Sequence, residues 1–356
     1  MSLIAIPPSI DASQRRSRQL EAEIAVAPGR FRVLTGDRPT GPLHVGHLFG
    51  TLLNRVRLQN AGADVMVLIA DYQAITDRDA PDSLPALVLG QVADYLAVGI
   101  DPERATIFAH SQVRALNQLL IPFLSLVSVA EVARNPTVKD EIAASGRGST
   151  SALMFSYPVH QAADILSCRA NLVPVGRDQL PHLEMTRTIA RRFNERYSPQ
   201  APYFPEPDGL LSDAPLLLGL DGAKMGKSRG NAIALAATAD ETARLVRSAR
   251  TDAERHISYD PAARPEVSNL VLLTALCLDA SPEGVAASVG GKGAAALKDQ
   301  LADALIERLR PIRARRSELA GQPGYLRQVL ADGAERAQTV ADATLARVQA
   351  LMHYVY

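Results

Sequence analysis

Two pairs of side chains, each pair spaced by three residues, are the features of this sequence best suited to chemistry. His44 and His47 stand in a glycine-containing stretch that follows the apolar run 31–35, and Lys224 and Lys227 stand far downstream in Lys-Met-Gly-Lys-Ser. A glycine-rich turn between a strand and a helix lets backbone N–H groups approach a phosphate, and the start of the helix favours negative charge. Histidines and lysines add hydrogen-bond donors. The two stretches together predict a site for a phosphate-bearing ligand.

A third group of polar residues lies in an otherwise apolar stretch. Tyr157, Gln161 and Asp164 share one face of a predicted helix, and the small pair Ala162-Ala163 leaves room beside them. A carboxylate accepts a hydrogen bond from an indole N–H, but it accepts one from a phenol O–H equally well. The stripe could instead face solvent. We expect a pocket wall, with the choice between an indole and a phenol left open by these residues alone.

Strand-like and helical stretches alternate from residue 31 to residue 197. Continuous apolar runs predict strands at 31–35, 65–70, 106–109 and 172–175, and helical patterns cover 44–61, 83–98, 114–133, 152–168 and 179–197. This alternation predicts an α/β fold, a doubly wound parallel sheet covered on both faces. Ligands bind such sheets beyond the carboxyl ends of the strands, where the glycine turn and Asp71-Tyr72-Gln73 are expected.

The chain divides into three parts by pattern. Residues 1–30 are polar and proline-punctuated and are expected to form a partly helical extension. Residues 31–237 carry the strand and helix alternation of the expected catalytic domain. Residues 238–356 have only helical periodicity, so they predict an all-helical domain whose C-terminal end can pack back on the catalytic domain.

Composition gives no direct sign of a nucleic-acid partner. The 356 residues include 38 basic and 38 acidic side chains, so any basic surface must be local. Arginines cluster in two helical stretches: Arg187, Arg191, Arg192 and Arg196, then Arg308, Arg310, Arg313, Arg315 and Arg316. The simpler interpretation of both clusters is a solvated helix face paired with nearby acids.

The cysteine, histidine and hydropathy patterns predict a chain in a reducing compartment. Cys168 and Cys277 are far apart, no histidine stands at metal-ligand spacing with a cysteine, and His44 and His47 have no acidic residue between or beside them in a metalloprotease pattern, so we expect no disulfide and no metal site. The longest apolar run, 116–130, is interrupted by polar residues and a proline, and the N-terminus lacks a signal-peptide pattern. We therefore expect a cytoplasmic location and no membrane partner.

The two motif stretches resemble the HIGH and KMSKS motifs of class I aminoacyl-tRNA synthetases. From residue 31 to the C-terminal helices the chain resembles the tryptophanyl-tRNA synthetases, above all at 35–41, 74–76, 162–166, 173–179 and 188–197. The resemblance implies a Rossmann-type catalytic domain, a helical anticodon-binding domain and a homodimer. It also implies ATP with Mg²⁺, L-tryptophan and tRNA(Trp), rather than DNA, as cofactors, substrates and partners.

The resemblance assigns a role to each matching residue. Asp164 would bind the indole nitrogen, and the other residues implied in the amino-acid pocket are Leu34, Gln73, Tyr157, Gln161, Val173 and Val175. The implied ATP site comprises Gly36, Arg38, Thr40, Gly46, Gly176, Asp178, Gln179, Met225 and Ser228. The implied catalytic residues are His44, His47, Lys224 and Lys227.

Several positions depart from the family pattern. Gln161 stands where most bacterial tryptophanyl enzymes have methionine and Gln73 where they commonly have histidine, so Tyr157, Gln161 and Asp164 follow the spacing of tyrosyl enzymes. Leu34 stands where tyrosyl enzymes place a substrate-contacting tyrosine, and an apolar wall favours an indole. We therefore expect tryptophan as substrate and an auxiliary-type enzyme. Gly226 replaces the usual serine of KMSKS.

Other function classes fit less well. Residues 221–228 are one residue away from a Walker A loop, but no strand and helix are predicted to flank them. A nucleotidyltransferase without tRNA would not need the helical part after residue 238. A tryptophan-binding paralogue without catalysis would not need the retained histidines and lysines, although Gly226 keeps that alternative open, and Leu34 disfavours a tyrosyl enzyme.

Overall fold

The centre of the molecule is a five-stranded parallel sheet. The computed structural model describes residues 10–76, 82–139, 151–211, 217–226 and 229–355. The strands are β1 (Arg32–Asp37), β2 (Asp64–Ile69), β3 (Ala105–Ala109), β4 (Leu172–Val175) and β5 (Asp208–Leu211), in the order β3-β2-β1-β4-β5. The α/β fold and the four predicted strands are confirmed. Sequence analysis missed β5, because four residues that include an aspartate and a glycine give no strand signal.

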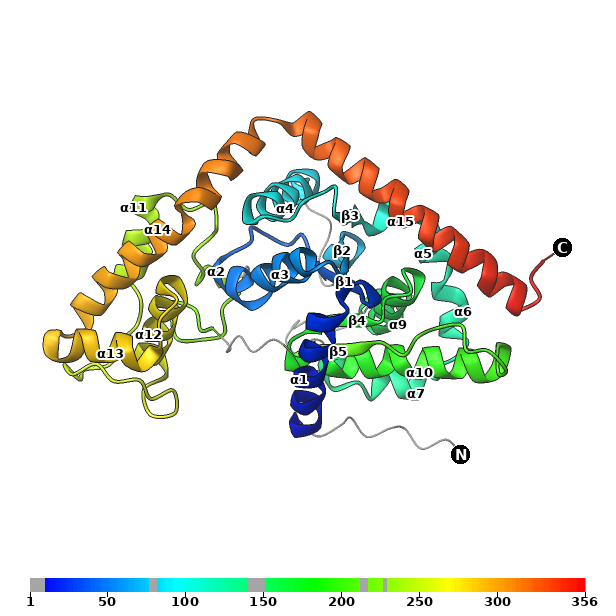
Figure 1. Ribbon diagram of the computed structural model, residues 1–356, viewed down its shortest axis with the longest axis horizontal. Coiled ribbons are helices and arrows are strands. Elements are labelled where there is room, and N and C mark those ends of the chain that lie inside the picture. The colour runs from blue at the N-terminus through cyan, green and yellow to red at the C-terminus, as the bar shows by residue number, and fades with distance from the viewer. Residues whose placement is uncertain (1–9, 77–81, 140–150, 212–216, 227–228, 356) are drawn as a thin grey trace.

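Helices surround the sheet and form a separate arm (Figure 1). Those within the first 200 residues are α1 (Ile10–Val26), α2 (Val45–His47), α3 (Leu53–Ala61), α4 (Leu84–Val98), α5 (Arg114–Gln118), α6 (Leu120–Leu124), α7 (Val129–Ala133), α9 (Ala152–Ser167) and α10 (Leu180–Tyr197). The later ones are α11 (Ala239–Arg247), α12 (Pro265–Leu278), α13 (Pro282–Val289), α14 (Ala294–Ala320) and α15 (Pro323–Leu351).

The single helix predicted over 114–133 is wrong, because the segment forms three short helices. Pro122 lies in the first turn of α6, where a missing N–H is tolerated, and it cannot continue a helix that began earlier. Ser128 starts α7 with a capping box, in which its hydroxyl accepts from the Glu131 N–H and the Glu131 side chain accepts from the Ser128 N–H. The helix predicted over 44–61 is interrupted by a π-helical turn, Leu48–Leu52.

The described part of the N-terminal segment packs against the sheet. Helix α1 lies along the edge strand β5 and buries Leu20 and Ile24. Arg16 bonds Asp208 at the start of β5 through Nε and Nη2, at 3.2 and 2.6 Å. The Ser17 hydroxyl accepts from the Leu211 N–H at 2.9 Å. The part of the 1–30 extension that the structure describes therefore covers a sheet edge rather than extending into solvent.

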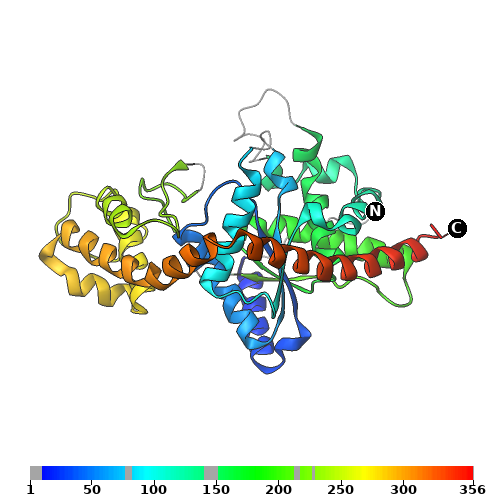
Figure 2. The same ribbon diagram turned by 90° about the horizontal axis from the view of Figure 1, so that it is seen from above.

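The last helix packs on the opposite edge of the sheet (Figure 2). Gly333 of α15 lies directly on β3, since a Cβ at this position would come within 1.8 Å of the Ile107 carbonyl oxygen. Arg336 donates to the Ala105 carbonyl at 3.1 Å. The C-terminal helix of the predicted 238–356 domain thus lies against the catalytic sheet, whereas helices α11–α14 form the arm.

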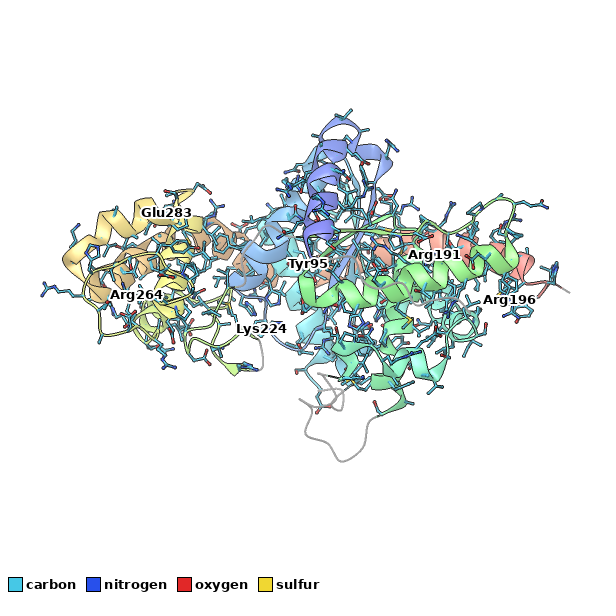
Figure 3. The ribbon with its side chains drawn as sticks, turned by 90° about the horizontal axis from the view of Figure 1, so that it is seen from below. Tyr95, Arg191, Arg196, Lys224, Arg264 and Glu283 are labelled. Carbon is cyan, nitrogen blue, oxygen red and sulfur yellow. The ribbon has the colours of Figure 1, made fainter. Side chains whose placement is uncertain are left out.

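The two arginine clusters are largely engaged within the molecule. On α10, Arg187, Arg191 and Arg192 pair with Glu184, Glu206 and Glu131, and Arg196 lies over the Tyr197 ring. Arg191 and Arg196 lie on the side of the molecule away from the helical arm (Figure 3). On α14, Arg308, Arg310 and Arg316 pair with Asp279, Glu307 and Asp94. The contacts of both clusters therefore agree with the simpler interpretation, in which the arginines lie on helix faces and pair with nearby acids.

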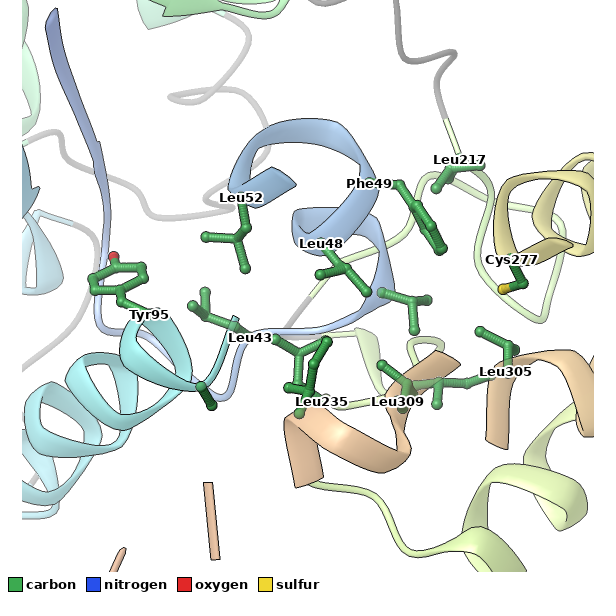
Figure 4. Packing of buried hydrophobic residues seen from close by; sticks show 14 of the residues in the cluster. Leu43, Leu48, Phe49, Leu52, Tyr95, Leu217, Leu235, Cys277, Leu305 and Leu309 are labelled. Carbon is green, nitrogen blue, oxygen red and sulfur yellow. The ribbon is translucent and has the colours of Figure 1, made fainter. Parts of the chain in front are cut away.

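One hydrophobic core joins the arm to the sheet (Figure 4). Leu43 and Leu48, beside the predicted histidine motif, belong to the same buried cluster as Leu305 and Leu309 of α14. This packing fixes the motif against two parts of the chain far apart in sequence. Within the described ranges no single helix is long and apolar enough to cross a membrane. The one pair that reaches that length and composition together, Pro265–Leu278 with Pro282–Lys292, is bent by 110°.

Candidate active site

A cavity of about 660 Å³ opens at the carboxyl ends of the strands. The strand order reverses between β1 and β4, and in open parallel sheets this switch point is where ligands bind. The end of β1, the end of β4 and one face of α9 line it. Seventeen of the predicted site residues line the cavity: Leu34, Gly36, Arg38, Thr40, His44, Gly46, His47, Gln73, Tyr157, Gln161, Asp164, Val173, Val175, Gly176, Gln179, Lys224 and Met225.

Three predicted residues are not part of this lining. Asp178 is exposed and its Oδ2 lies 3.4 Å from Lys224 Nζ, so it contacts the site through that lysine. Lys227 and Ser228 lie outside the described residues.

The two motif histidines are oriented by backbone hydrogen bonds. His44 precedes α2, and its Nδ1 accepts from the Gly46 N–H at 3.2 Å. His47 Nδ1 accepts from the His44 N–H at 3.3 Å, so the two rings lie 3.8 Å apart between centroids. Because each Nδ1 accepts a hydrogen bond, a neutral ring carries its proton on Nε2. Each histidine therefore has an Nε2–H donor, the group needed to bind a phosphate oxygen.

Glycine is required where the two motifs touch. A Cβ at Gly46 would come within 2.9 Å of Met225 Sδ and 3.0 Å of the His44 ring. Met225 belongs to the lysine loop, so the missing side chain at residue 46 lets that loop approach the histidines directly.

A buried ion pair that sequence analysis missed supports the turn after β1. Asp37 Oδ2 accepts from Arg55 Nη1 at 2.6 Å and from the Tyr95 hydroxyl at 2.8 Å. Burial, the largest single effect, would lower the pKa of Arg55, but the charges and hydrogen bonds of Asp37 and Tyr95 together outweigh it and the pKa is raised. Gln91 adds a bond to the Arg38 carbonyl at 3.0 Å. The arginine lies 18 residues beyond its partner, which no spacing rule signals.

The lysine loop is tied to the histidine turn by a short antiparallel bridge. The Val45 N–H donates to the Ile233 carbonyl at 3.0 Å and the Leu235 N–H to the Leu43 carbonyl at 2.9 Å. This bridge brings Lys224 to the phosphate end of the cavity, between the sheet and the arm (Figure 3).

Asn231, a second residue that sequence analysis missed, organises the lysine loop. Its Nδ2 donates to Asp221 Oδ1 at 2.8 Å and to the Lys224 carbonyl at 3.2 Å, and its Oδ1 accepts from the Gly226 N–H at 3.0 Å.

This loop bears no resemblance to a phosphate loop between a strand and a helix, since residues 217–226 form turns and one isolated bridge.

The other end of the cavity is a mixed apolar and polar pocket. Asp164 is 2% exposed, and Leu34 and Val173 are buried beside the same cavity. The Tyr157 hydroxyl bonds His182 Nε2 at 3.0 Å, and His182 Nδ1 bonds Asn135 Nδ2 at 3.2 Å. Burial lowers the pKa of His182 to about 4, so the ring is neutral at pH 7. Sequence analysis missed His182, which orients Tyr157.

Two further buried histidines lie beside Asp164. His110 follows β3, and its Nε2 lies 2.9 Å from Asp164 Oδ1. His160 lies one turn before Asp164 on α9, and burial lowers its pKa. The i,i+4 spacing of His160 and Asp164 was visible in the sequence, but nothing there signalled His110.

Comparison with known proteins places this site in a family. The family model of class I tRNA synthetases (W and Y) matches residues 27–310. The tryptophan–tRNA ligase of Streptococcus agalactiae is 44% identical over 91% of this chain and 98% of its own length, and that of Treponema pallidum is 42% identical over 90% and 96%.

Solved structures agree with the sequence comparison. The tryptophanyl-tRNA synthetase of Campylobacter jejuni, complexed with ADP and tryptophan, is 29% identical and superposes with a TM-score of 0.78 over 90% of this chain and 99% of its own. With a matching family model, close relatives over nearly the full length and both motifs at one cavity, this chain belongs to the class I aminoacyl-tRNA synthetases of the tryptophan and tyrosine family.

Proposed function

We propose that this chain is a tryptophan–tRNA ligase, which joins L-tryptophan to ATP and then transfers it to tRNA(Trp). The observation that carries the proposal is a single cavity with donors at one end and a buried carboxylate in an apolar wall at the other. Relatives that are 42–44% identical over at least 90% of this chain have the same activity in their names.

The first step needs positioning rather than a side-chain nucleophile. The tryptophan carboxylate is ionised at neutral pH and attacks the α-phosphorus. A new carboxyl O–P bond forms, and the bond between the α-phosphorus and the bridging oxygen breaks, so pyrophosphate leaves with the electron pair. Catalysis is then alignment and stabilisation of charge on the phosphates. Nε2–H of His44 and His47 donates to phosphate oxygens, and Lys224 and Lys227 neutralise the departing pyrophosphate.

The adenosine and amino-acid ends follow from the lining of the cavity. Gly176, Asp178 and Gln179, directly after β4, face the ribose and adenine, whereas Val173 and Val175 belong to the amino-acid pocket. Asp164 accepts the indole N–H, while Leu34 contacts the ring. In the second step, the ribose hydroxyl of the tRNA terminus attacks the adenylate carbonyl and AMP leaves.

Mg²⁺ fits this site as a companion of the phosphates. The carboxylates at the phosphate end are already engaged, Asp37 with Arg55 and Asp178 with Lys224. Phosphate oxygens and water would then supply the ligands that Mg²⁺ prefers, and the ion would neutralise phosphate charge.

Tyrosine is the competing substrate, because the family includes both specificities. Gln161 and Asp164 could both bond a phenol hydroxyl. Leu34, which is 4% exposed, offers that hydroxyl no partner and is well suited to an indole. A site built to bind a hydroxyl rejects an analogue without one by several orders of magnitude, so a single assay separates the two specificities.

The test is amino-acid-dependent ATP–pyrophosphate exchange with tryptophan and tyrosine in parallel, followed by aminoacylation of tRNA(Trp). Exchange with tryptophan alone is expected. Exchange with tyrosine alone would contradict the proposal. Because the chain contains no tryptophan, ligand fluorescence reports binding directly, and binding without exchange would indicate a paralogue without catalysis.

Replacement of Lys227 by alanine tests the lysine loop. Adenylate formation should slow far more than tryptophan binding weakens, because the lysine meets charge that develops on the leaving group. Equal losses in both would assign the loop a structural role only.

The assembly and location of the enzyme belong to the same proposal. We expect a homodimer, and Ile121 and Val129, 71% and 75% exposed near α6 and α7, offer apolar surface for a subunit contact.

Helices α11–α14 form the region that approaches the anticodon. Because tRNA and ATP meet in the cytoplasm, we expect the enzyme there, and light scattering during size-exclusion chromatography would give the oligomeric state.

A further inference from the structure

Directly behind the amino-acid pocket, Asp164 lies in a compact buried group with His110 and His160, two histidines that the proposed aminoacylation chemistry does not use. His110, His160 and Asp164 are 0%, 3% and 2% exposed. One ligand-type atom from each lies within 4.8 Å of the other two. In the part of the chain that the structure describes, His110 Nδ1 and His160 Nδ1 are buried without a hydrogen bond, and His110 Nε2 and Asp164 Oδ1 are buried with only each other as partner, 2.9 Å apart. Buried polar atoms normally have partners, so two unpartnered nitrogens beside this buried pair require an explanation.

The orientation of His160 is fixed by a neighbouring amide. Asn117 Nδ2 donates to the carbonyls of His110 and Val113, both at 3.1 Å. The Asn117 Oδ1 atom must then be the one that faces His160 Nε2 at 3.0 Å, and as an acceptor it requires a proton on that nitrogen. In the neutral ring, the buried Nδ1 therefore carries a lone pair and no proton.

The carboxylate has two differently placed oxygens. Oδ1 is the buried one and lies 2.9 Å from His110 Nε2. Oδ2 is not among the buried unpartnered atoms, and Asp164 lines the cavity, so Oδ2 is the oxygen available to a ligand there. The side chain can thus bind one group in the cavity and another behind it.

We propose that His110, His160 and Asp164 form a binding site for a divalent transition-metal ion of the Zn²⁺ type, directly behind the amino-acid pocket. Two imidazoles and a carboxylate favour Zn²⁺ and related ions over Mg²⁺ or Ca²⁺. Tetrahedral ligands at about 2.1 Å from Zn²⁺ lie about 3.4 Å apart, so binding requires the widest gap to close by about 1.4 Å and the His110–Asp164 pair, 2.9 Å apart, to open by about 0.5 Å. Asn117 supplies the outer hydrogen bond that metal-bound histidines usually make.

The ion has a consequence for the amino-acid site that rests on the proposed function. Bound to Oδ1, it fixes the carboxylate with Oδ2 toward the indole N–H. Tryptophan and the ion then bind together, and Zn²⁺ should tighten tryptophan binding severalfold. The spacing analysis that predicted no metal site missed this cluster because His110 comes from a different strand–helix connection than the other two residues.

The direct test measures metal binding by the full-length chain after treatment with a chelator. We expect one Zn²⁺ per chain by calorimetry, and visible d–d absorption when Co²⁺ replaces it. His110→Gln and His160→Gln should each lower the Zn²⁺ affinity at least tenfold and remove the Co²⁺ spectrum. His256→Gln changes an exposed histidine in the same way and should leave both unaffected.

Two results would overturn the proposal. One is Zn²⁺ binding that is the same in the wild type and in the His110→Gln/His160→Gln double variant, or lost instead in His47→Gln, which would place the ion at the motif histidines. The other is displacement of Zn²⁺ by tryptophan, because the two ligands use different oxygens here. None of these measurements depends on pyrophosphate exchange, so a failure of the metal site and a failure of the proposed activity remain distinguishable.

Discussion

The two motif loops meet at the same phosphate end but are held in different ways. The turn after β1 is supported from below by buried side chains, with Arg55 1% exposed and Tyr95 0%. The lysine loop is held from one side by Asn231, and the side chain of Lys224 is 62% exposed. Rigid support suits groups that must be in place before ATP arrives, whereas a lightly held loop suits charges that act while pyrophosphate leaves. We therefore expect substitutions that remove the support of the turn after β1 mainly to lower stability. Substitutions in the lysine loop should mainly lower the reaction rate.

The largest expected effect comes from removing Asp37. Asp37→Ala leaves the Arg55 charge buried without its partner, and breaking such a pair destabilises a protein by about 3–5 kcal/mol. Urea unfolding of the variant and of the wild type measures this loss of unfolding free energy. Asp64→Ala is the matched control, because its pair with Arg32 also lies by the sheet but is 47% and 35% exposed. Exposed pairs contribute about 0–1 kcal/mol. Similar losses in the two variants would show that the turn has no rigid support.

How much of the fold and of the site could be predicted depends on whether the residues involved are close together in the sequence. The motifs, the parallel sheet and the i,i+4,i+7 stripe on α9 are local patterns, and the structure brings seventeen of the predicted site residues to one cavity. The supports are not local. Arg55, Asn231 and His182 act on residues from other elements, and their contacts exist only after the chain folds. Strand β5 and the break at Pro122 were missed because tertiary packing outweighs weak propensities.

The next effect tests the lightly held loop. Asn231→Ala removes the bonds to the Lys224 carbonyl and the Gly226 N–H, so Lys224 loses its position. A displacement of about 1 Å can cost about 10²-fold in rate, and we expect that loss in kcat for pyrophosphate exchange with little change in KM for tryptophan.

The control for this variant is Asn171→Ala. Asn171 also joins two backbone segments, accepting from the Arg32 N–H and donating to the Arg30 carbonyl, but it lies outside the cavity. The Asn171→Ala variant should be less stable than the wild type but keep the wild-type kcat for pyrophosphate exchange. A loss of rate in both variants would indicate general loosening instead of loop positioning.

A pH dependence of stability is expected from the amino-acid end. His182 has a folded-state pKa of about 4 against 6.5 when unfolded, so below pH 6.5 the unfolded chain binds a proton that the folded chain does not. His182 therefore lowers stability as the pH falls between 6.5 and 4, by about 2 kcal/mol from pH 7 to pH 5, and His160, whose pKa burial also lowers, adds to the fall in the same direction.

The check is to measure unfolding free energies at pH 7 and pH 5 for the wild type and His182→Gln, whose amide can still bond Tyr157. The difference between the two pH values should shrink by about 2 kcal/mol in the variant. This range avoids carboxylates such as Glu131, whose pKa the Arg192 hydrogen bond lowers to about 2. An unchanged difference would mean that His182 is not the group responsible.

The smallest effect concerns Gly226, the glycine of the lysine loop. A Cβ there would meet nothing closer than Arg229 at 3.9 Å, and its φ is not left-handed, so serine fits without strain. Replacing a glycine at a compatible position stabilises an ordered conformation by about 0.4–1 kcal/mol, a factor of about 2–5. If closure of this loop limits the rate, Gly226→Ser should raise the rate of pyrophosphate exchange by that factor and leave the melting temperature nearly unchanged. Gly230→Ala is the opposite case, since φ is +64° there and a side chain is strained. A rate that stays constant in Gly226→Ser would show that the loop is already ordered before ATP binds, and the contrast between a rigid turn and a lightly held loop would then not extend to catalysis.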